Sequence, residues 1–217
     1  MIPDQKPIWD RKHSQKDHEE LRHKPSPLVR IAEPMFKRQS KILELGCGVG
    51  RDAVFLHRHG HDVVATDSSE IAIEQDIDHF GELNIKFIVL DIQDPLPYKP
   101  ESFDVVYANL SLHYYSHQKT REIIEEIYRL LKPDGFLAFA CKSVDDFHHG
   151  NGEEVEENIF VSAKGHVRHL FSKEYTVELL EGLFEVKYLD TVEELYSGEK
   201  SNILRCIAKK IIKNQTV

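Results

Sequence analysis

The sequence predicts an α/β protein built on a doubly wound, mostly parallel sheet. Short apolar segments alternate with amphipathic segments of helical period between about residues 41 and 143, and this alternation is typical of helices that cover both faces of a sheet. Most of the apolar segments are continuous, as in strands buried on both faces. The last two, 184–190 and 201–211, have no helix between them, which predicts an antiparallel hairpin at one edge.

The N-terminal part of the chain precedes this alternation. Residues 1–27 are polar and rich in Lys, His and Pro, so we expect an arm that is at most partly helical. The apolar residues from Leu28 to Met35 predict a short helix, broken at Pro34 because proline removes a backbone donor. Trp9 is the one tryptophan, and the sequence leaves two places for it, over a bound cofactor or against an end of the sheet.

Five strands and three helices are expected between residues 41 and 143. The strands consist mainly of β-branched and aromatic residues, the helix at 118–131 places its isoleucines and leucines on one side, and the sequence KPDG at 132–135 predicts a turn. Gly60 and Gly81 stop two helices, and Ser68 or Ser69 caps one. The expected strands are 41–46, 62–67, 85–91, 103–110 and 136–143, and the expected helices are 51–60, 69–81 and 118–131.

The alternation of strands and helices stops after the fifth strand. Residues 144–170 are polar, rich in histidine and long for a connection, which predicts a lid or insertion near a site. The HxxH pair within them lacks the HExxH spacing and has no accompanying cysteine, so we expect no metal. A helix at 172–182 and the terminal hairpin follow. We therefore predict one domain, 1–217, with an arm and helix at 1–40, a core at 41–143, a probable lid at 144–170 and a C-terminal part at 171–217.

Composition and charge argue against several classes of protein, such as nucleic-acid-binding, disulfide-rich and membrane proteins. The 217 residues suit one domain, and the net charge of -9 argues against a nucleic-acid partner, since phosphates need clustered Lys and Arg. Cys47, Cys141 and Cys206 lie in apolar runs without a CxxC pair, which predicts buried thiols rather than disulfides or zinc. The charged start lacks the apolar region of a signal peptide, and no run approaches a membrane span. We therefore expect a cytoplasmic protein without a membrane partner.

The segment "ILELGCGVGRDAVFL", residues 42–56, places three glycines between a strand and a helix. Glycine lets the backbone turn tightly and approach a ligand, and a helix N-terminus adds exposed N–H groups. Dinucleotides and S-adenosylmethionine (AdoMet) both use such a loop. The dinucleotide pattern GxGxxG needs glycine where Arg51 stands, and Glu44 would repel a pyrophosphate but suits a cationic ligand. The segment therefore disfavours NAD.

Acidic residues end the next two strands. Asp67 lies about 20 residues beyond the glycine loop, where a carboxylate can accept hydrogen bonds from the ribose of either NAD or AdoMet. Asp91 could accept a hydrogen bond from an adenine amine. Each acid taken singly could instead be a solvated cap. Together they favour binding, because open α/β sheets bind ligands at the edge where the parallel strands end.

Four motifs in order resemble those of class I AdoMet-dependent methyltransferases. "ILELGCGVGRDAVFL" is similar to motif I and "VVATDSS" to the acidic loop. "VLDIQDPLPYKPESFDVVYANLSLHYYS" is similar to the adenine-binding strand with the strand-four motif, and "EIYRLLKPDGFLAFACKS" to the helix and fifth strand that follow. The resemblance runs from about Lys41 to Ser143. The segments outside it resemble small-molecule enzymes of the tellurite-resistance and thiopurine type.

The resemblance implies a seven-stranded sheet with helices on both faces and one antiparallel edge strand, the last in the sequence. It also implies AdoMet as cofactor, with the glycine loop at the methionine part, the acidic loop at the ribose, the third strand at the adenine and the end of strand four near the sulfonium. The cofactor-binding residues expected on this basis are Glu44, Gly46, Cys47, Gly48, Asp67, Ser68, Asp91, Ile92 and Asn109.

Methyl transfer from a sulfonium requires mainly that donor and acceptor are held in line. An oxygen or nitrogen acceptor can also need a base, for which His113 and Tyr114 are candidates just past strand four; the alternative for His113 is a packing or capping role. We expect a small-molecule acceptor, because the NPPY or DPPY tetrad of nucleic-acid amine methylases is absent. A non-catalytic cofactor-binding scaffold and, less favoured, an NAD-dependent oxidoreductase stay open, as does a monomer or homodimer.

Overall fold

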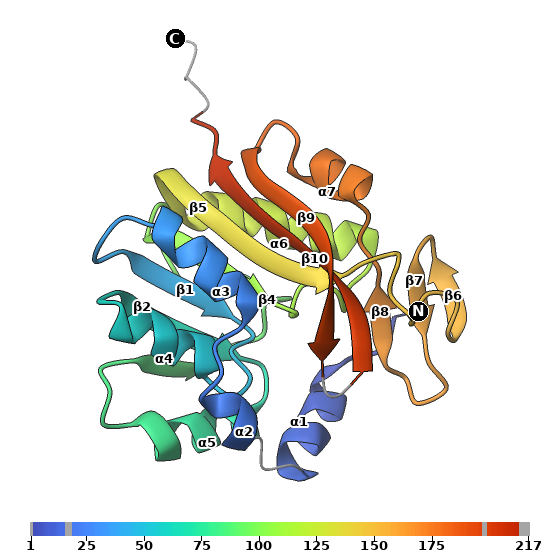
Figure 1. Cartoon of the computed structure of the whole chain (residues 1–217), viewed down its shortest axis with the longest axis horizontal. Coiled ribbons are helices and arrows are strands. Elements are labelled where there is room, and N and C mark those ends of the chain that lie inside the picture. The colour runs from blue at the N-terminus through green and yellow to red at the C-terminus, as the bar shows by residue number, and fades with distance from the viewer. Residues whose placement is uncertain (1, 16–18, 197–198, 213–217) are drawn as a thin grey trace.

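A seven-stranded sheet forms the centre of the computed structural model, which describes residues 2–15, 19–196 and 199–212 (Figure 1). The strands are β1 (Lys41–Leu45), β2 (Asp62–Asp67), β3 (Lys86–Val89), β4 (Phe103–Asn109), β5 (Leu131–Lys142), β9 (Phe184–Tyr196) and β10 (Glu199–Lys210). Their order is β3-β2-β1-β4-β5-β10-β9. The pairs from β3 to β5 are parallel, and β10 is antiparallel to both of its neighbours.

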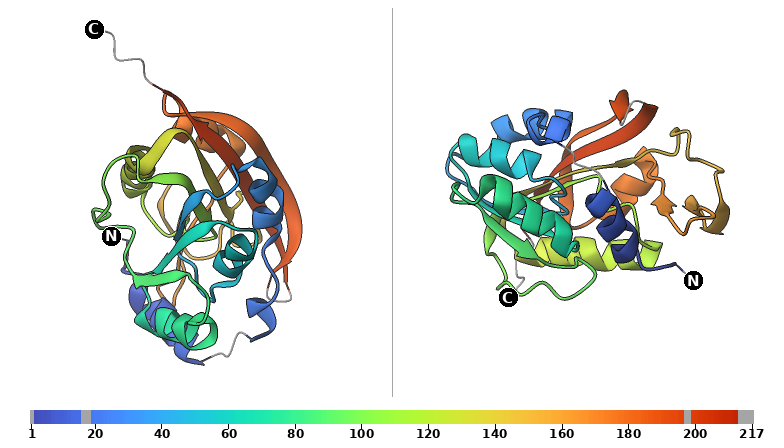
Figure 2. Two further views of the ribbon diagram at one scale, coloured as in Figure 1. Left: turned by 90° about the vertical axis from the view of Figure 1, so that its left-hand side faces the viewer. Right: turned by 90° about the horizontal axis from the view of Figure 1, so that it is seen from below.

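Helices cover both faces of this sheet and create a hydrophobic core on each (Figure 2). The doubly wound α/β fold class is therefore confirmed. Helices α3, α4 and α5 contribute apolar side chains to the core on one face, and α6 and α7 to the core on the other. The bounds of these helices are α3 (Pro27–Ala32), α4 (Arg51–Arg58), α5 (Glu70–Phe80), α6 (His117–Leu130) and α7 (Lys173–Leu180). Ser69, one of the two serines expected to cap α5, accepts the hydrogen bond from the Ala72 N–H at 3.3 Å.

The antiparallel strand lies one place in from the edge, which corrects the expected edge position. The final hairpin forms as predicted, but β10 inserts between β5 and β9, and β9 is the edge strand. β10 pairs with β5 from Ile203 to Lys209. The start of β5 also differs. The strand begins at Leu131 instead of residue 136 and absorbs the expected turn as an irregularity, in which Asp134 has a φ of 63°.

The N-terminal arm is partly helical. It forms α1 (Lys6–Gln15) and α2 (Glu19–Arg22), and α3 is followed by the short 3-10 helix η1 (Glu33–Met35), which begins where the break at Pro34 was expected. Local sequence supports α1 weakly, through the Lys6–Asp10 ion pair one turn apart. Most of what holds α1 comes from distant segments, such as the bond from Gln75 Nε2 to the His13 carbonyl at 3.1 Å.

Residues 144–170, where we expected a lid or insertion, contain a small antiparallel sheet. Its strands are β6 (Glu153–Glu156), β7 (Ile159–Val161) and β8 (Val167–His169), in that order. The side chains of Ile159, Phe160 and Val167 are buried, so the segment has an apolar interior that its many charged and histidine residues conceal in the sequence. Within the ranges that the structure describes, no helix is long and apolar enough to cross a membrane.

Candidate active site

A cleft opens where β1, β2 and β4 end. It encloses about 1150 Å³ of empty space, including solvent at its mouth. Its position is the carboxyl edge of the parallel strands, where open α/β sheets bind ligands. All nine expected cofactor-binding residues and Tyr114 line the cleft: Glu44, Gly46, Cys47, Gly48, Asp67, Ser68, Asp91, Ile92 and Asn109.

The glycine loop forms the floor of the cleft. Gly46 has a φ of 75°, a left-handed conformation that strains other residues, and an added Cβ would lie 2.5 Å from the Cβ of Ser111. Gly48 also has a positive φ, 61°, but a Cβ there would meet nothing within 4 Å. The N–H groups of Gly46 and Cys47 both donate to the Thr66 carbonyl at 2.8 Å. The loop is thus tied to β2 while its bare backbone at Gly48 adjoins open space.

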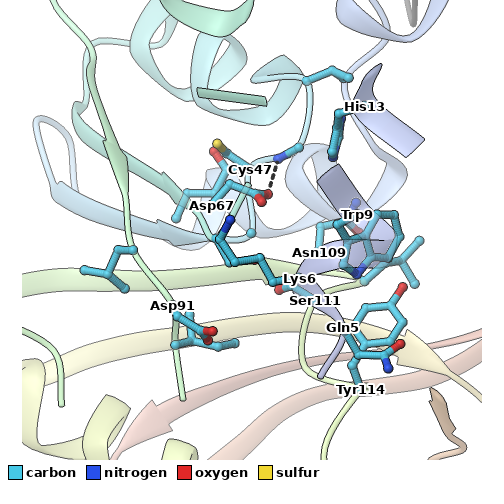
Figure 3. A pocket seen from close by; sticks show the side chains of 18 of the residues that line it. Gln5, Lys6, Trp9, His13, Cys47, Asp67, Asp91, Asn109, Ser111 and Tyr114 are labelled. Carbon is cyan, nitrogen blue, oxygen red and sulfur yellow. Dashed lines mark hydrogen bonds between the residues drawn. The ribbon is translucent and has the colours of Figure 1, made fainter. Parts of the chain in front are cut away.

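Asp67 joins the end of β2 to this loop. Its Oδ2 accepts the Gly48 N–H at 2.9 Å (Figure 3), and its Oδ1 accepts the Ser69 N–H at 2.9 Å. Burial raises the pKa of Asp67, while the two N–H donors act in the opposite direction. Each carboxylate oxygen retains a lone pair, so Asp67 can hold the loop and still accept hydrogen bonds from hydroxyl groups of a ligand in the cleft.

Glu44 offers a buried carboxyl group to the cleft. Its side chain is 2% exposed, and its Oε2 has no hydrogen-bond partner among the residues that the structure describes. Burial raises the pKa of Glu44 well above its usual value, and the neighbouring carboxylates of Asp52 and Asp76 raise it further. A cation in the cleft would stabilise the ionised form, so the residues present fit the ammonium or sulfonium of AdoMet.

The two ends of the cleft differ in character. Asp91 lies at one end, and Trp9, Asn109 and Tyr114 lie toward the other (Figure 3). Trp9 and Tyr114 pack edge to face, with ring centroids 5.3 Å apart. A ligand long enough to reach from Asp91 past Asp67 to Asn109 would therefore have one end against an aromatic wall.

Residues 42–135 match the model of a protein family described as a methyltransferase domain. Residues 42–135 are thus identified as a methyltransferase domain. Malonyl-[acyl-carrier protein] O-methyltransferase of Enterobacter lignolyticus is 26% identical over 171 residues, which cover 76% of this chain and 62% of that protein. The chain thus spans less than two thirds of this relative's length.

Solved structures have the same fold as the methyltransferase domain and its flanking segments. A SAM-dependent methyltransferase from Methanosarcina mazei has a TM-score of 0.73 at 24% identity, with 84% of this chain and 98% of that chain covered. The 1,6-didemethyltoxoflavin-N1-methyltransferase of Burkholderia thailandensis, solved with S-adenosylhomocysteine and 1,6-didemethyltoxoflavin, has a TM-score of 0.72 at 20% identity and covers 94% of this chain and 88% of its own.

The two catalytic candidates lie in different environments. Tyr114 lines the cleft of the methyltransferase domain, whereas His113 is 1% exposed and is not among the lining residues. Burial lowers the pKa of His113 well below its usual value, and the charge of Arg168 contributes. Its ring packs 4.3 Å from that of Tyr114, and its carbonyl accepts the His169 N–H at 3.0 Å. His113 is thus a neutral imidazole packed beside Tyr114.

Sequence reasoning missed the contribution of α1. Lys6, Trp9 and His13 of this helix line the cleft, as does Gln5 just before it, so this helix supplies a wall of the site. The only signal in the sequence was a single tryptophan in a polar arm. Burial is the largest influence on His13 and lowers its pKa, although Asp67 and Asp10 act in the opposite direction.

The histidines of residues 144–170 have separate surroundings. His148 contacts Asp146 at 2.5 Å, and His166 contacts Lys12 at 2.8 Å. His169 is buried, with its Nδ1 3.3 Å from Thr120. Across the described ranges, no three His, Cys, Asp or Glu side chains are grouped so as to hold a metal ion.

A buried ion pair fastens the N-terminal arm beneath the glycine loop. Arg22 of α2 donates to Asp76 of α5 at 2.9 Å, and both side chains are almost fully buried. The Cys47 thiol also donates to Asp76, at 3.6 Å. Burial raises the pKa of Asp76 from 3.8 to about 7, although Arg22 and the thiol lower it. The carboxylate under the cofactor loop therefore titrates near neutral pH.

We expect the stability difference between the wild type and Asp76→Asn to depend on pH. Because folding raises the pKa of Asp76 to about 7, the folded chain holds an extra proton between about pH 4 and pH 7. The resulting stabilisation is complete below about pH 4 and is lost as the pH rises through 7, with a slope of up to about 1.4 kcal/mol per unit. Urea titrations at several pH values give the free energy of unfolding of both proteins. The value for the wild type minus the value for Asp76→Asn should show this slope. Asp78→Asn, on the exposed side of the same helix, is the control, and a pH-independent difference for Asp76→Asn would contradict the prediction.

Proposed function

We propose that this chain transfers a methyl group from AdoMet to a small-molecule acceptor. One observation carries the proposal: Asp67 binds the Gly48 backbone at 2.9 Å at the floor of a cleft that Glu44 also lines. Asp67 can accept hydrogen bonds from ligand hydroxyl groups, and the buried carboxyl group of Glu44 would be ionised beside a cation. AdoMet has both the ribose hydroxyl groups and the positive charge that match this arrangement. The membership of residues 42–135 in a methyltransferase family supports the same conclusion.

The cofactor residues divide into three groups along the cleft. In this proposal Gly46, Cys47 and Gly48 contact the methionine part, with Glu44 and Asn109 near its charged groups. Asp67 and Ser68 hold the ribose, and Asp91 and Ile92 frame the adenine. Bound AdoMet supplies an activated methyl group on a sulfonium. The residues of the chain then bind AdoMet and the acceptor, orient them in line and shield them from water. In-line positioning in a water-poor site accounts for much of the acceleration of such a displacement.

Tyr114 and His113 are proposed to act at the acceptor. Tyr114 lines the cleft and can contact the acceptor directly. His113 lies behind it at 4.3 Å between ring centroids, where its neutral imidazole holds the tyrosine ring in position. In this arrangement an acceptor that needs a base would meet Tyr114 first.

The whole chain is proposed to act as one domain. Residues 1–40 supply the arm and first helices, 41–143 the cofactor-binding core, 144–170 a lid and 171–217 the last helix and the hairpin.

The acceptor is a small molecule rather than a nucleic acid, in keeping with the net charge of -9. The assembly is a monomer or a homodimer. The relatives named above act on malonyl-[acyl-carrier protein] and on 1,6-didemethyltoxoflavin, so a test of turnover needs a broad acceptor panel.

Isothermal titration with S-adenosylhomocysteine and with AdoMet tests the proposal. We expect micromolar or tighter binding of both, and release of S-adenosylhomocysteine with at least one member of a panel of thiol, amine, hydroxyl and carboxylate acceptors. NADH, titrated by fluorescence, is the control ligand and should not bind. Absence of binding of either adenosyl compound would refute the function. Binding without turnover on any acceptor would favour the cofactor-binding scaffold.

A further inference from the structure

Charge is unevenly distributed along the cleft. Four carboxylates line it, and all of them come from the core, from β1 to the loop after β3. The aromatic wall of Trp9 and Tyr114 and the lining residues between β4 and Tyr114 carry no charge. The acidic part suits cationic AdoMet, so on the proposed function the uncharged part is left for the acceptor. The four carboxylates belong to Glu44, Asp52, Asp67 and Asp91, and the uncharged residues are Trp9, Asn109, Leu110, Ser111 and Tyr114.

The basic side chains that line the cleft add no free charge to the aromatic wall. Lys6 is paired with Asp10 at 2.9 Å, and Arg51 begins α4 beside the glycine loop. Burial has the largest influence on His13 and lowers its pKa, which favours the neutral imidazole. A charged acceptor at this wall would lose hydration without gaining a partner of opposite charge, and that loss costs free energy.

The two rings of the aromatic wall form a corner. Their centroids lie 5.3 Å apart, and their planes meet at 73°. Aromatic rings attract one another in offset-stacked and edge-to-face arrangements. Because the two planes are almost perpendicular, a flat ring that stacks on one of them meets the other edge to face. The corner thus offers both favourable arrangements to one planar aromatic molecule, whereas a saturated ring of the same size gains neither.

Packing and hydrogen bonds fix this corner in place. Tyr114 is 7% exposed, and the ring of His113 packs against it at 4.3 Å between centroids. Gln5, just before the helix that carries the tryptophan, donates to the Gly165 carbonyl at 3.1 Å and accepts the Val167 N–H at 3.0 Å. Rings that are already positioned lose little conformational freedom when a ligand binds, so the corner is suited to selecting its ligand.

A polar edge adjoins the corner. Ser111 Oγ donates to the Leu45 carbonyl at 2.6 Å, which leaves its lone pairs able to accept a hydrogen bond. Asn109 lies toward the same end of the cleft as the two rings (Figure 3), and its carboxamide can donate and accept. Ser111 also lies against the glycine loop, since a Cβ added to Gly46 would be 2.5 Å from its own Cβ. An O–H or N–H that reaches Ser111 is therefore next to the proposed site of the methionine part of AdoMet.

We propose that the methyl acceptor is an uncharged, planar aromatic molecule that packs into the corner of Trp9 and Tyr114 and receives the methyl group on a ring hydroxyl or ring N–H directed at Ser111. In the transfer, the oxygen or nitrogen of the acceptor uses an electron pair to form the bond to the methyl carbon and releases its proton to water at the mouth of the cleft. The bond between that carbon and the sulfur breaks, and its electron pair stays on the sulfur. The acceptor class rests on the proposed function, because it requires AdoMet in the acidic part of the cleft.

Calorimetry on the complex of the full chain with S-adenosylhomocysteine tests the acceptor class. The uncharged aromatic probes are 4-hydroxybenzamide, which offers a hydroxyl, and indole-5-carboxamide, which offers a ring N–H. 4-Hydroxybenzoate and 4-hydroxybenzylamine are the anionic and cationic counterparts, and 4-hydroxycyclohexanecarboxamide is the saturated one. We expect at least one uncharged aromatic probe to bind about tenfold more tightly than each counterpart. The tighter of the two identifies the acceptor atom as oxygen or nitrogen.

The tryptophan reports on the place of binding. Trp9 is the one tryptophan of the chain, so the labelled protein has a single indole N–H signal in NMR spectra. Stacking of an aromatic probe in the corner should shift this signal, and the saturated counterpart should leave it in place. A tightly bound aromatic probe that leaves the signal unchanged would show that it binds elsewhere, which would overturn the inference.

Three variants complete the test. Trp9→Ala should weaken the uncharged aromatic probe about tenfold, and Trp9→Phe, which keeps a ring, should weaken it less. Arg11→Ala, at an exposed position of the same helix, is the control and should bind the probe like the wild type. Titration of each variant with S-adenosylhomocysteine reports whether its cleft has folded, and we expect wild-type affinity in all three.

The outcomes separate the acceptor class from the proposed function. Failure of the wild type to bind S-adenosylhomocysteine would refute the proposed function and the acceptor class with it. With that binding intact, equal affinity for uncharged, charged and saturated probes, or no binding of either uncharged aromatic probe, would overturn the acceptor class alone. A tenfold loss of S-adenosylhomocysteine affinity in Trp9→Ala but not in Arg11→Ala would also overturn it, because the tryptophan would then belong to the cofactor site.

Discussion

Asp67→Ala should weaken the binding of S-adenosylhomocysteine by about 100-fold or more. The proposed contacts to the ribose hydroxyls are hydrogen bonds to a charged group, each of which is worth about 1.5–3 kcal/mol. The substitution also removes the acceptor for the Gly48 N–H, which Asp67 holds at 2.9 Å. The glycine loop then loses a contact that fixes its shape. The substitution therefore removes hydrogen bonds to the ligand and also loosens the loop that binds it.

The measurement is isothermal titration beside a matched variant. Asp62→Ala removes a carboxylate from the other end of the same strand, where the side chain is exposed, and should bind like the wild type. Thermal unfolding of both variants would show that β2 is intact. If Asp67→Ala binds the ligand as well as Asp62→Ala does, the assignment of Asp67 to the cofactor is wrong.

Gly46→Ala should lower the free energy of unfolding by about 3 kcal/mol. The left-handed backbone costs about 1–2 kcal/mol for a residue with a Cβ, since φ at Gly46 is 75°. Overpacking a filled site adds about 1–3 kcal/mol, and the new Cβ would lie 2.5 Å from the Cβ of Ser111. Urea denaturation gives the total loss.

Two further variants separate the two costs. Gly182 has a similar φ, 70°, but a Cβ there would meet nothing within 4 Å, so Gly182→Ala should show the backbone cost alone. Ser111→Gly removes the atom with which the new methyl group collides. The double variant Gly46→Ala, Ser111→Gly should therefore be less destabilised than the sum of its single changes. Equal losses for Gly46→Ala and Gly182→Ala, with additive behaviour in the double variant, would show that the loop does not pack against Ser111.

The core of the site could be anticipated because its signals are local. A strand of continuous apolar residues, a run of glycines and a helix that begins at Arg51 are each recognisable without knowledge of the rest of the chain. Parallel strands end at the same edge, so strands expected to finish at Asp67 and Asp91 would bring both carboxylates to the glycine loop. Strand β3 ends at Val89, two residues earlier, and the cleft does include both carboxylates and the loop. Their roles toward AdoMet stay predictions, which the titrations above test.

The remaining parts of the site could not be anticipated, because they depend on contacts between distant segments. Gln5 bonds to the Gly165 carbonyl, 160 positions away, at 3.1 Å, and also accepts the Val167 N–H at 3.0 Å. A polar helix such as α1 shows no apolar face that would reveal where it packs. The burial of His113 behind Tyr114 is similarly a matter of neighbours, since the two residues are adjacent in the sequence and only one reaches the cleft.

The sequence alone determined the succession of strands and helices between residues 41 and 143, and the glycine and aspartate positions at their ends. Periodicity and turn residues act over a few positions, so they can be read directly. Only the tertiary structure decided that β10 lies inside the edge strand, that residues 144–170 form a small sheet, and that α1 walls the cleft. These arrangements minimise exposed apolar surface and unpaired backbone groups across the whole chain, and no short segment carries that information.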